Sequence, residues 1–352
     1  MEILKKDQIF ELLSSKITSG EYPPGFRFPT ELQFSRELGV AKVTLRSALA
    51  RLEQLGMVER KVSQGTFVPK HFVPMGKRFV VIQPSFPDIS NPYHYIMPGI
   101  ERRSMEKKVE LVRTSYEYAG SPSFFQETQC SGIIILGCCF TGTEPILNAV
   151  REAGLPAVIV GRNTDHKATQ LPVIATDNHN AWLSGLNYLK KRKFKKIATL
   201  WYNSGELHTR INGDYAQLLH EIGLEEAVPL VFSAQYNAQS IRDTVDKILE
   251  LPQLPEVIIG YSDFFALIIM EHLKARKIKV PGDIAVMGCC GYPGSAFLET
   301  PLSTIDFQYE KKGARAVDLL LEANRWFHSK DTVSGEYIPA VIIERASTIR
   351  KK

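Results

Sequence analysis

Cysteine is scarce in this sequence of 352 residues, and its placement argues against most cysteine chemistry. There are 5 cysteines, an odd number, and Cys138–Cys139 and Cys289–Cys290 are adjacent pairs. Zinc knuckles and redox motifs instead separate two cysteines by two residues. We therefore expect reduced, mostly buried thiols, although an oxidant-sensing role for the pairs stays open. The sequence predicts no metal site and no cofactor.

Long apolar runs are also lacking. No run approaches the ~18 residues that a membrane helix needs, and the amino terminus has no apolar signal region. We expect a cytoplasmic protein with no membrane partner.

The motifs of common enzymes are absent as well. No Gly-x-Gly-x-x-Gly follows an apolar strand, and no phosphate loop, Gly-x-Ser-x-Gly elbow or His-rich metal pattern occurs. An α/β enzyme would therefore lack an evident base or nucleophile, so we predict no enzyme activity. A transport-type sugar-binding protein would need a signal peptide and would leave residues 1–70 without a role. An enzyme and a transport-type binding protein are the two alternative hypotheses for this chain.

The chain is long enough for two domains, and its 44% hydrophobic content suffices for packed cores. The first 77 residues carry 12 Lys and Arg against 8 Asp and Glu, so most of the formal net charge of +5 lies there. Charge alone does not identify a nucleic-acid-binding module. Its coincidence with the pattern at residues 28–68 is the informative point.

Residues 28–68 have the pattern of two short helices followed by a β-hairpin. Thr30 is a good N-cap and Gln33 can complete a capping box, so the first helix should run to about Leu38. After Gly39, a second helix with a basic amino end carries apolar residues close to a 3.6-residue period. A hairpin with a polar tip at residues 61–65 follows. This arrangement suits duplex DNA, whose major groove is about 12 Å wide. The predicted apolar stripe of the second helix is Val43, Leu45, Leu49, Leu52 and Leu55.

This stretch resembles the GntR family of winged-helix transcription factors. Lys42 replaces an Arg that reads bases in that family, and Lys lacks the guanidinium fork. Ala41 replaces the usual capping Ser, and Leu32 lies where many members carry a DNA-contacting Arg. The shared pattern comprises Gly20, Pro24-Gly25, Phe28-Pro29-Thr30-Glu31, residues 40–46, residues 48–52, Gly56 and Gly65-Thr66-Phe67-Val68. The resemblance implies that double-stranded DNA contacts Lys42, Val43, Thr44, Arg46, Gln64, Gly65 and Thr66.

Short apolar strands alternate with helical stretches in the remainder of the chain. Continuous apolar runs such as Ile133-Ile134-Ile135-Leu136 indicate strands covered on both faces. The sequence predicts an α/β fold class: a winged helix-turn-helix domain at 1–70, a linker at 71–78, and a doubly wound parallel α/β domain at 79–350. In such sheets, ligands bind beyond the carboxyl ends of the strands.

The second domain resembles the effector domain of the LacI/GalR repressors, which is similar to periplasmic sugar-binding proteins. The resemblance implies two lobes joined by three crossings of the chain. Lobe 1 would hold about 79–174 and 291–328, and lobe 2 about 175–290 and 329–350. It also implies a homodimer on an inverted repeat. Matching pieces include Asn91-Pro92-Tyr93, Gly132-Ile133-Ile134, Thr176-Asp177-Asn178, Ser262-Asp263 and residues 280–286.

By the same resemblance, a sugar or sugar derivative binds between the lobes. A guanidinium or a carboxylate can hold two neighbouring hydroxyls, and aromatic rings favour the C–H face of a sugar. Arg210 or Asp263 could instead form a surface ion pair or a helix cap, and His94 could be a packing residue. Cys290 replaces a sugar-binding carboxylate and Phe307 a frequent Gln, so the pocket is less polar than usual. The implied ligand-binding residues are Asn91, Tyr93, His94, Arg162, Arg210, Tyr236, Asp263, Cys290 and Phe307.

Together these resemblances predict a ligand-responsive transcription regulator with the AraR-type combination of GntR head and LacI-type effector domain. The simplest version is a repressor of carbohydrate-utilisation genes. Its expected partners are operator DNA, a small-molecule effector and a second copy of the chain. Whether the ligand releases or promotes DNA binding does not follow from the sequence.

Overall fold

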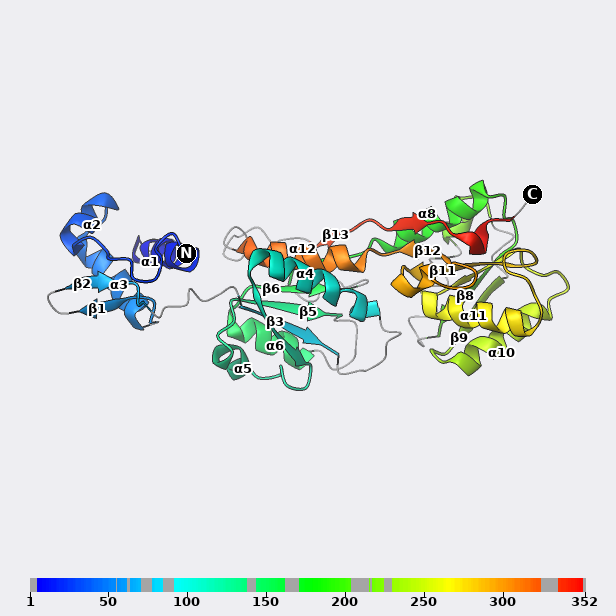
Figure 1. The fold of residues 1–352 in the computed structure, drawn as a ribbon, viewed down its shortest axis with the longest axis horizontal. Helices are drawn as coiled ribbons and strands as arrows, with labels where there is room; N and C mark the ends of the chain where they lie inside the picture. Colours follow the sequence, from blue (N-terminus) through cyan, green and yellow to red (C-terminus); the bar gives the residue numbers. More distant parts are fainter. Residues whose placement is uncertain are drawn as a thin grey trace.

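The structure is a computed structural model. It describes residues 5–54, 56–61, 64–70, 78–84, 92–137, 144–161, 171–203, 215, 217–224, 230–323 and 335–350. Figure 1 shows three bodies in a row, a small one at the amino end and two larger α/β bodies. We call the small body the head, the middle body lobe 1 and the far body lobe 2.

The head is a winged helix-turn-helix domain. Thr30 caps α2 as predicted, accepting the N–H of Gln33 at 3.3 Å. The Gln33 amide donates to Glu37, however, so the predicted capping box is not completed. Leu45, Leu49 and Leu52 are buried in the head's core, as expected. The elements are α1 (Lys5–Thr18), α2 (Glu31–Glu37), α3 (Lys42–Gln54) and the antiparallel strands β1 (Glu59–Lys61) and β2 (Gly65–Phe67), which form the wing.

Val43 does not belong to the apolar stripe of α3, and its assignment there was wrong. Its side chain is 78% exposed. Two residues before Leu45, it points about 200° around the helix from that residue, because each residue turns an α-helix by about 100°. Val43 therefore lies on the outer face of α3.

Lobe 1 contains a six-stranded sheet in the order β13-β7-β6-β5-β3-β4, with every paired strand parallel. All residues of β5 and β6 are buried, which confirms that the apolar runs are strands covered on both faces. The elements are β3 (Arg78–Gln83), the 3-10 helix η1 (Pro92–Tyr95), α4 (Met97–Lys107), β4 (Glu110–Ser115), α5 (Pro122–Glu127), β5 (Gly132–Leu136), α6 (Glu144–Ala153), β6 (Ala157–Val160), β7 (Val173–Ala175), α12 (Tyr309–Leu321) and β13 (Glu336–Tyr337).

Lobe 2 contains the second six-stranded sheet, in the order β14-β12-β11-β10-β8-β9. Its pairs are parallel except β12 with β14, which is antiparallel. The elements are α8 (Asn178–Lys191), β8 (Ile197–Tyr202), β9 (Val231–Ala234), α10 (Ala238–Leu249), β10 (Val257–Gly260), α11 (Asp263–Ala275), β11 (Ala285–Cys290), η3 (Pro293–Ala296), β12 (Ser303–Asp306), β14 (Val341–Ile343) and η4 (Ala346–Thr348).

The chain crosses between the two sheets three times, as the resemblance implies, but two crossings lie later than expected. The first falls between β7 and α8, near the predicted boundary at residue 175. The second falls at residues 307–308, because β12 pairs with β11 inside the lobe 2 sheet. The third falls at residues 338–340, because β13 pairs with β7 in lobe 1. Residues 291–306 therefore belong to lobe 2, where the sequence-based division assigned them to lobe 1.

Candidate DNA-binding surface and effector cleft

The amino end of α3 presents the side chains that were predicted to contact DNA. Lys42, Val43 and Arg46 are exposed and Thr44 is half-buried. Leu45, beside them in sequence, is fully buried and anchors this turn in the core. The first turn of α3 can therefore enter a groove without disturbing the packing beneath it.

Arg46 is held in place by a carboxylate from the preceding helix. Its Nε and Nη2 donate to Glu31 Oε2 at 3.0 and 2.8 Å, and this bonding lowers the pKa of Glu31. Arg60 on β1 donates to the backbone oxygen of Arg46 at 3.4 Å. Such an exposed ion pair adds little stability. The ion pair joins α2 to α3, and the Arg60 hydrogen bond joins α3 to the wing.

The wing supplies a second part of this surface. Gln64 and Gly65 are exposed and Thr66 is half-buried, so the predicted residues lie at the hairpin's surface. Gly65 has φ +113°, a conformation that side-chain-bearing residues rarely adopt. Arg27, which the sequence reasoning missed, lies beside it, with its guanidinium 5.7 Å from the Phe67 ring. Arg27 forms an antiparallel bridge with Phe67, and this pairing could not be anticipated from the motif alone.

The structure describes only some of the predicted ligand-binding residues. Asn91, Arg162 and Arg210 lie outside the described residues, as does the side chain of Tyr93. His94 is exposed in η1. The other four, Tyr236, Asp263, Cys290 and Phe307, all lie at or near the junction of the two lobes.

Asp263 is sealed inside lobe 2 rather than presented to a ligand. It is 0% exposed at the start of α11. Its Oδ1 accepts the Thr304 hydroxyl at 2.6 Å. Its Oδ2 accepts the Ser295 hydroxyl at 2.8 Å and the Tyr292 N–H at 2.6 Å. Burial raises the pKa of Asp263 to about 7 against the opposing effect of these three donors. The structure thus places Asp263 as the anchor of the turn at residues 291–295.

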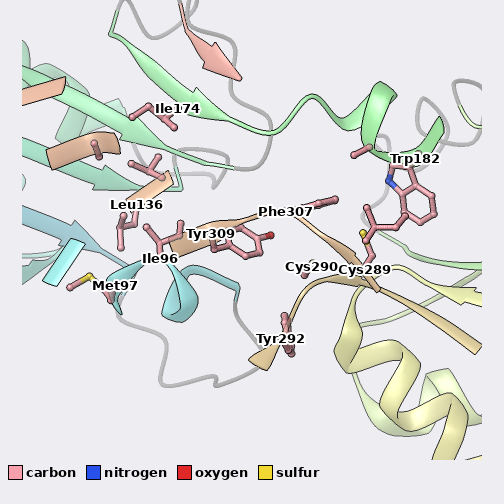
Figure 2. Packing of buried hydrophobic residues seen from close by; sticks show 14 of the residues in the cluster. Ile96, Met97, Leu136, Ile174, Trp182, Cys289, Cys290, Tyr292, Phe307 and Tyr309 are labelled. Atoms are coloured by element: carbon pink, nitrogen blue, oxygen red, sulfur yellow. The ribbon is translucent and has the colours of Figure 1, made fainter. Parts of the chain in front are cut away.

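Cys290 and Phe307 are also fully buried. Cys290 ends β11 with φ +102°, a left-handed conformation that is unusual for a residue with a side chain. Phe307 stands on the second crossing, and Figure 2 shows it between Tyr309 of α12 and Cys290. Both side chains are therefore packed inside the protein near the lobe junction.

A row of four tyrosines follows the carboxyl ends of four neighbouring strands in lobe 2. In sheet order, Tyr292 follows β11, Tyr261 follows β10, Tyr202 ends β8 and Tyr236 follows β9. We call these residues the tyrosine row. Tyr202 lies 5.6 Å from Tyr236 and 5.9 Å from Tyr261 between ring centroids. Tyr236 stacks on Phe264 at 5.2 Å and 10°. Only Tyr236 of this row was predicted from the sequence.

Lobe 1 contacts the tyrosine row through Tyr95 of η1. The Tyr95 and Tyr292 rings lie 4.5 Å apart at 38°. Burial raises the pKa of Tyr95, and the nearby Asp263 carboxylate raises it further. Burial likewise raises the pKa of Tyr292, with a contribution from a hydrogen bond to Tyr236. The two lobes therefore meet at an aromatic contact close to Asp263 and Cys290.

A hydrogen-bonded network ties the three crossings together. Lys312 of α12 is 0% exposed, and its ammonium donates to Thr176 Oγ1 at 2.7 Å and to the Gly161 oxygen at 3.4 Å. The Gln308 side chain donates to the Pro339 oxygen at 2.5 Å. The Ile338 N–H donates to the Ala175 oxygen at 2.9 Å. Each crossing is thus hydrogen-bonded to another crossing or to α12.

No helix within the described ranges is long and apolar enough to cross a membrane. In the same ranges, no group of three or more His, Cys, Asp or Glu residues is arranged to hold a metal ion.

Two family models match parts of the chain. Residues 5–68 match the bacterial regulatory proteins of the gntR family, and residues 186–348 match the periplasmic binding protein-like domain. The fold and the two sites define a transcription regulator with a DNA-binding head and a separate effector domain. More particularly, the chain combines a domain that matches the gntR family with a domain that matches the periplasmic binding protein-like family.

Similar proteins share this organisation or its second part. The arabinose metabolism transcriptional repressor of Geobacillus stearothermophilus is 22% identical over 332 residues, or 90% of each chain. The repressor CytR of Escherichia coli K12 is 26% identical over 204 residues, covering 57% of this chain and 58% of CytR. A ribose-bound LacI-family regulator from Enterococcus faecium has a TM-score of 0.63 and 18% identity, covering 78% of this chain and all of that one. CcpA of Lactococcus lactis has a TM-score of 0.62 and 20% identity over the same shares. The structural likeness shows the fold of the effector domain.

Proposed function

We propose that this protein is a repressor whose binding to an operator is controlled by a small hydroxylated molecule held between lobes 1 and 2. One observation supports the proposal above all. The same chain contains a helix, α3, whose exposed amino end is basic, and a two-lobed domain whose three interlobe crossings are joined by hydrogen bonds. The arabinose repressor with the same organisation and the ribose-bound relative support a carbohydrate-related effector. Regulation of carbohydrate-utilisation genes is the corresponding biological role.

The head would bind double-stranded DNA through α3 and the wing. Lys42, Val43, Thr44 and Arg46 would meet bases and phosphates in the major groove. Gln64, Gly65 and Thr66 at the wing, together with Arg27, would contact the adjacent backbone. This assignment rests on the exposure of all these residues except the half-buried Thr44 and Thr66, and on the Glu31–Arg46 pair, which directs the guanidinium.

The effector domain would transmit ligand binding as a change in lobe angle. A ligand shifts the balance between an open and a closed form only by the difference in its affinity for the two. Because lobe 1 follows the head in the chain, its rotation against lobe 2 would change the separation of two heads in a dimer. We assign residues 1–70 to the head and 71–77 to the linker, and place lobe 1 at 78–175, 309–323 and 335–337. Lobe 2 is then 177–306 and 341–350.

A homodimer on an inverted repeat follows from the size of the head, which covers one half-site. Large exposed apolar side chains in both lobes support such an interface. Met105 on α4 is 80% exposed and Phe297 after η3 is 89% exposed. Light scattering at micromolar concentration should give the dimer mass, and a monomer mass with and without DNA would contradict this part of the proposal.

The experiment that tests the proposed function uses the full-length protein and random duplex DNA. Rounds of selection should enrich one inverted-repeat sequence, and fluorescence anisotropy should then show tight binding that falls steeply with salt. Failure to enrich any sequence would reject the repressor assignment. A cytoplasmic location and the lack of enzyme activity remain predictions that belong to the same proposal.

A further inference from the structure

Positive charge is concentrated in lobe 2 at the turn between α8 and β8. Six of the seven residues at 190–196 are Lys or Arg, whereas the whole chain after residue 77 carries 31 Lys and Arg against 30 Asp and Glu. The run begins in the last turn of α8 and ends just before β8. We call residues 190–196, together with Lys277, Lys279 and Arg350, the basic tip.

The fold places the basic tip far from the junction of the two lobes. α8 starts directly after the first crossing, and its 14 residues carry the chain about 20 Å away at 1.5 Å per residue. β8 then runs back, parallel to β10, toward the edge where Tyr292 meets Tyr95 of lobe 1. The basic tip therefore lies at the opposite edge of the sheet, where the strands begin. Figure 1 shows lobe 1 between the head and lobe 2, so the tip belongs to the body farther from the head.

A second segment brings further positive charge to the same edge. The Glu256 N–H donates to the Lys196 oxygen at 2.8 Å, and the Ala285 N–H donates to the Glu256 oxygen at 3.0 Å. The amino ends of β8, β10 and β11 therefore lie side by side. Lys277 and Lys279 are exposed in the loop that leads into β11. The fold thus adds these cations to the run at 190–196.

The acidic groups beside the basic tip neutralise only part of its charge. Glu344 forms an ion pair with Arg192, and Glu256 forms one with Arg350 at 3.5 Å. Among the residues that the structure describes, no acidic side chain forms an ion pair with a lysine of the run. Several cations therefore remain available to an anionic partner. The exposed lysines of the run are Lys190, Lys191, Lys193, Lys195 and Lys196.

The composition of the basic tip fits a phosphate backbone better than a protein surface. Protein interfaces are depleted in lysine, and buried aromatic or apolar side chains anchor them. The run at 190–196 holds five lysines, and its one aromatic residue, Phe194, is only 2% exposed. Contacts to DNA phosphates need exposed positive charge and carry no sequence information. The chemistry of the tip is therefore that of a sequence-independent DNA contact.

We propose that the basic tip is a second DNA-contact surface, which binds the phosphate backbone of a duplex without sequence preference. This surface is separate from the head, and the inference goes beyond the proposed function. A protein whose heads hold an operator would hold a second duplex segment with lobe 2. Each lysine that meets a phosphate releases about one counterion, so this binding should weaken steeply as salt is added.

Fluorescence anisotropy on the full-length protein tests the proposal once one unlabelled selected operator per dimer occupies the heads. A labelled duplex of unrelated sequence is then added at several salt concentrations. The operator-bound wild type should bind this duplex. In the triple variant Lys191→Gln, Lys193→Gln, Lys195→Gln, the slope of log affinity against log salt should be less steep by roughly three. An operator-bound wild type that takes up no second duplex, or an unchanged slope in the triple variant, overturns the proposal.

A second triple variant, Lys107→Gln, Lys108→Gln, Lys311→Gln, is the matched control. It removes the same charge from exposed positions of lobe 1 and should keep the wild-type slope. An equal change of slope in both triple variants would show that net charge, and not the basic tip, holds the second duplex. Operator affinity reports on the proposed function separately, because the variant of the basic tip retains the whole head and should bind the operator as the wild type does.

Poly-glutamate tests the competing assignment of the basic tip to an acidic protein. Its extended chain carries one charge per roughly 3.3 Å, whereas duplex DNA carries one per roughly 1.7 Å. At equal total charge, poly-glutamate should therefore displace the labelled duplex less well than unlabelled duplex does. Equal or better displacement by poly-glutamate would overturn the assignment to DNA and favour an acidic protein.

Discussion

The two sites of this chain are built in opposite ways. In the head, the Arg46 side chain is 56% exposed and its partner Glu31 is 24% exposed. In the effector domain, Asp263 is fully buried and accepts three hydrogen bonds. The head is therefore ready to meet a partner of opposite charge without rearranging its core. The Asp263 carboxylate, in contrast, is already occupied by donors from its own lobe, so it could bind a ligand only after these hydrogen bonds are broken.

The largest expected effect comes from breaking the buried site. Asp263→Leu leaves the Tyr292 N–H and two hydroxyls without their acceptor, and we expect the free energy of unfolding to fall by about 2–5 kcal/mol. Calorimetry should show a melting temperature lower by about 5–15 °C. Asp263→Asn keeps the shape and one acceptor oxygen and should lose less. A Leu variant as stable as the wild type would show that the buried carboxylate does not hold the turn at residues 291–295.

Arg46→Ala tests the exposed site. We expect this substitution to lower the affinity for DNA and to leave the stability of the protein unchanged. The variant should bind the selected operator roughly 10- to 100-fold more weakly, as loss of a base or phosphate contact would do. Its melting temperature should stay near that of the wild type, since an exposed ion pair stabilises little. Arg51→Ala is the control on the same helix, because Arg51 pairs with Asp7 and lies over the Phe10 ring. Equal losses in both variants would mean that charge, rather than the reading face, determines affinity.

The buried Asp263 also predicts that the stability of the effector domain depends on pH. Burial raises the pKa of Asp263 from 3.8 to about 7. Between these values the native state binds more protons than the unfolded state, so the free energy of unfolding falls as pH rises. This stabilising contribution is fully present below the pKa of the unfolded state and is lost above the pKa of the native state. Melting temperatures measured from about pH 5 to about pH 8 should decline less steeply in Asp263→Asn than in the wild type. Parallel slopes in the two proteins would contradict the assignment.

Val43→Ala should have the smallest effect. With 78% of Val43 exposed, the substitution removes little buried area, and the melting temperature should not change measurably. Operator binding should weaken by no more than roughly fivefold, consistent with loss of an apolar contact to a base. The decisive comparison is an operator in which single thymines are replaced by uracil, which removes their methyl groups. The wild type should be sensitive to one such replacement and Val43→Ala should not.

The sequence was most informative where the structure is local. The cap at Thr30, the break at Gly39 and the spacing of Leu45, Leu49 and Leu52 lie within about 25 residues, and all appear in the head as predicted. Val43 was misplaced because a hydrophobic residue near the start of a helix was assumed to face the core.

Long-range arrangement was harder to predict. The tyrosine row depends on the sheet order β11-β10-β8-β9, which no local pattern specifies. The resemblance placed a boundary between the lobes at about residue 291, but residues 291–295 form a turn inside lobe 2 that Asp263 anchors. The short strand β12 likewise gave no sign of which sheet it joins. The sequence identified residue types that lie near the lobe junction. It could not predict that they are buried and hydrogen-bonded, because their partners come from distant parts of the chain.

The claim that the cleft controls the head is tested most directly by operator anisotropy with and without the sugar probe that binds best in calorimetry. A saturating amount of this probe should change the operator affinity of the wild type by at least about fivefold. Saturation of the cleft with no change in operator affinity would contradict the account.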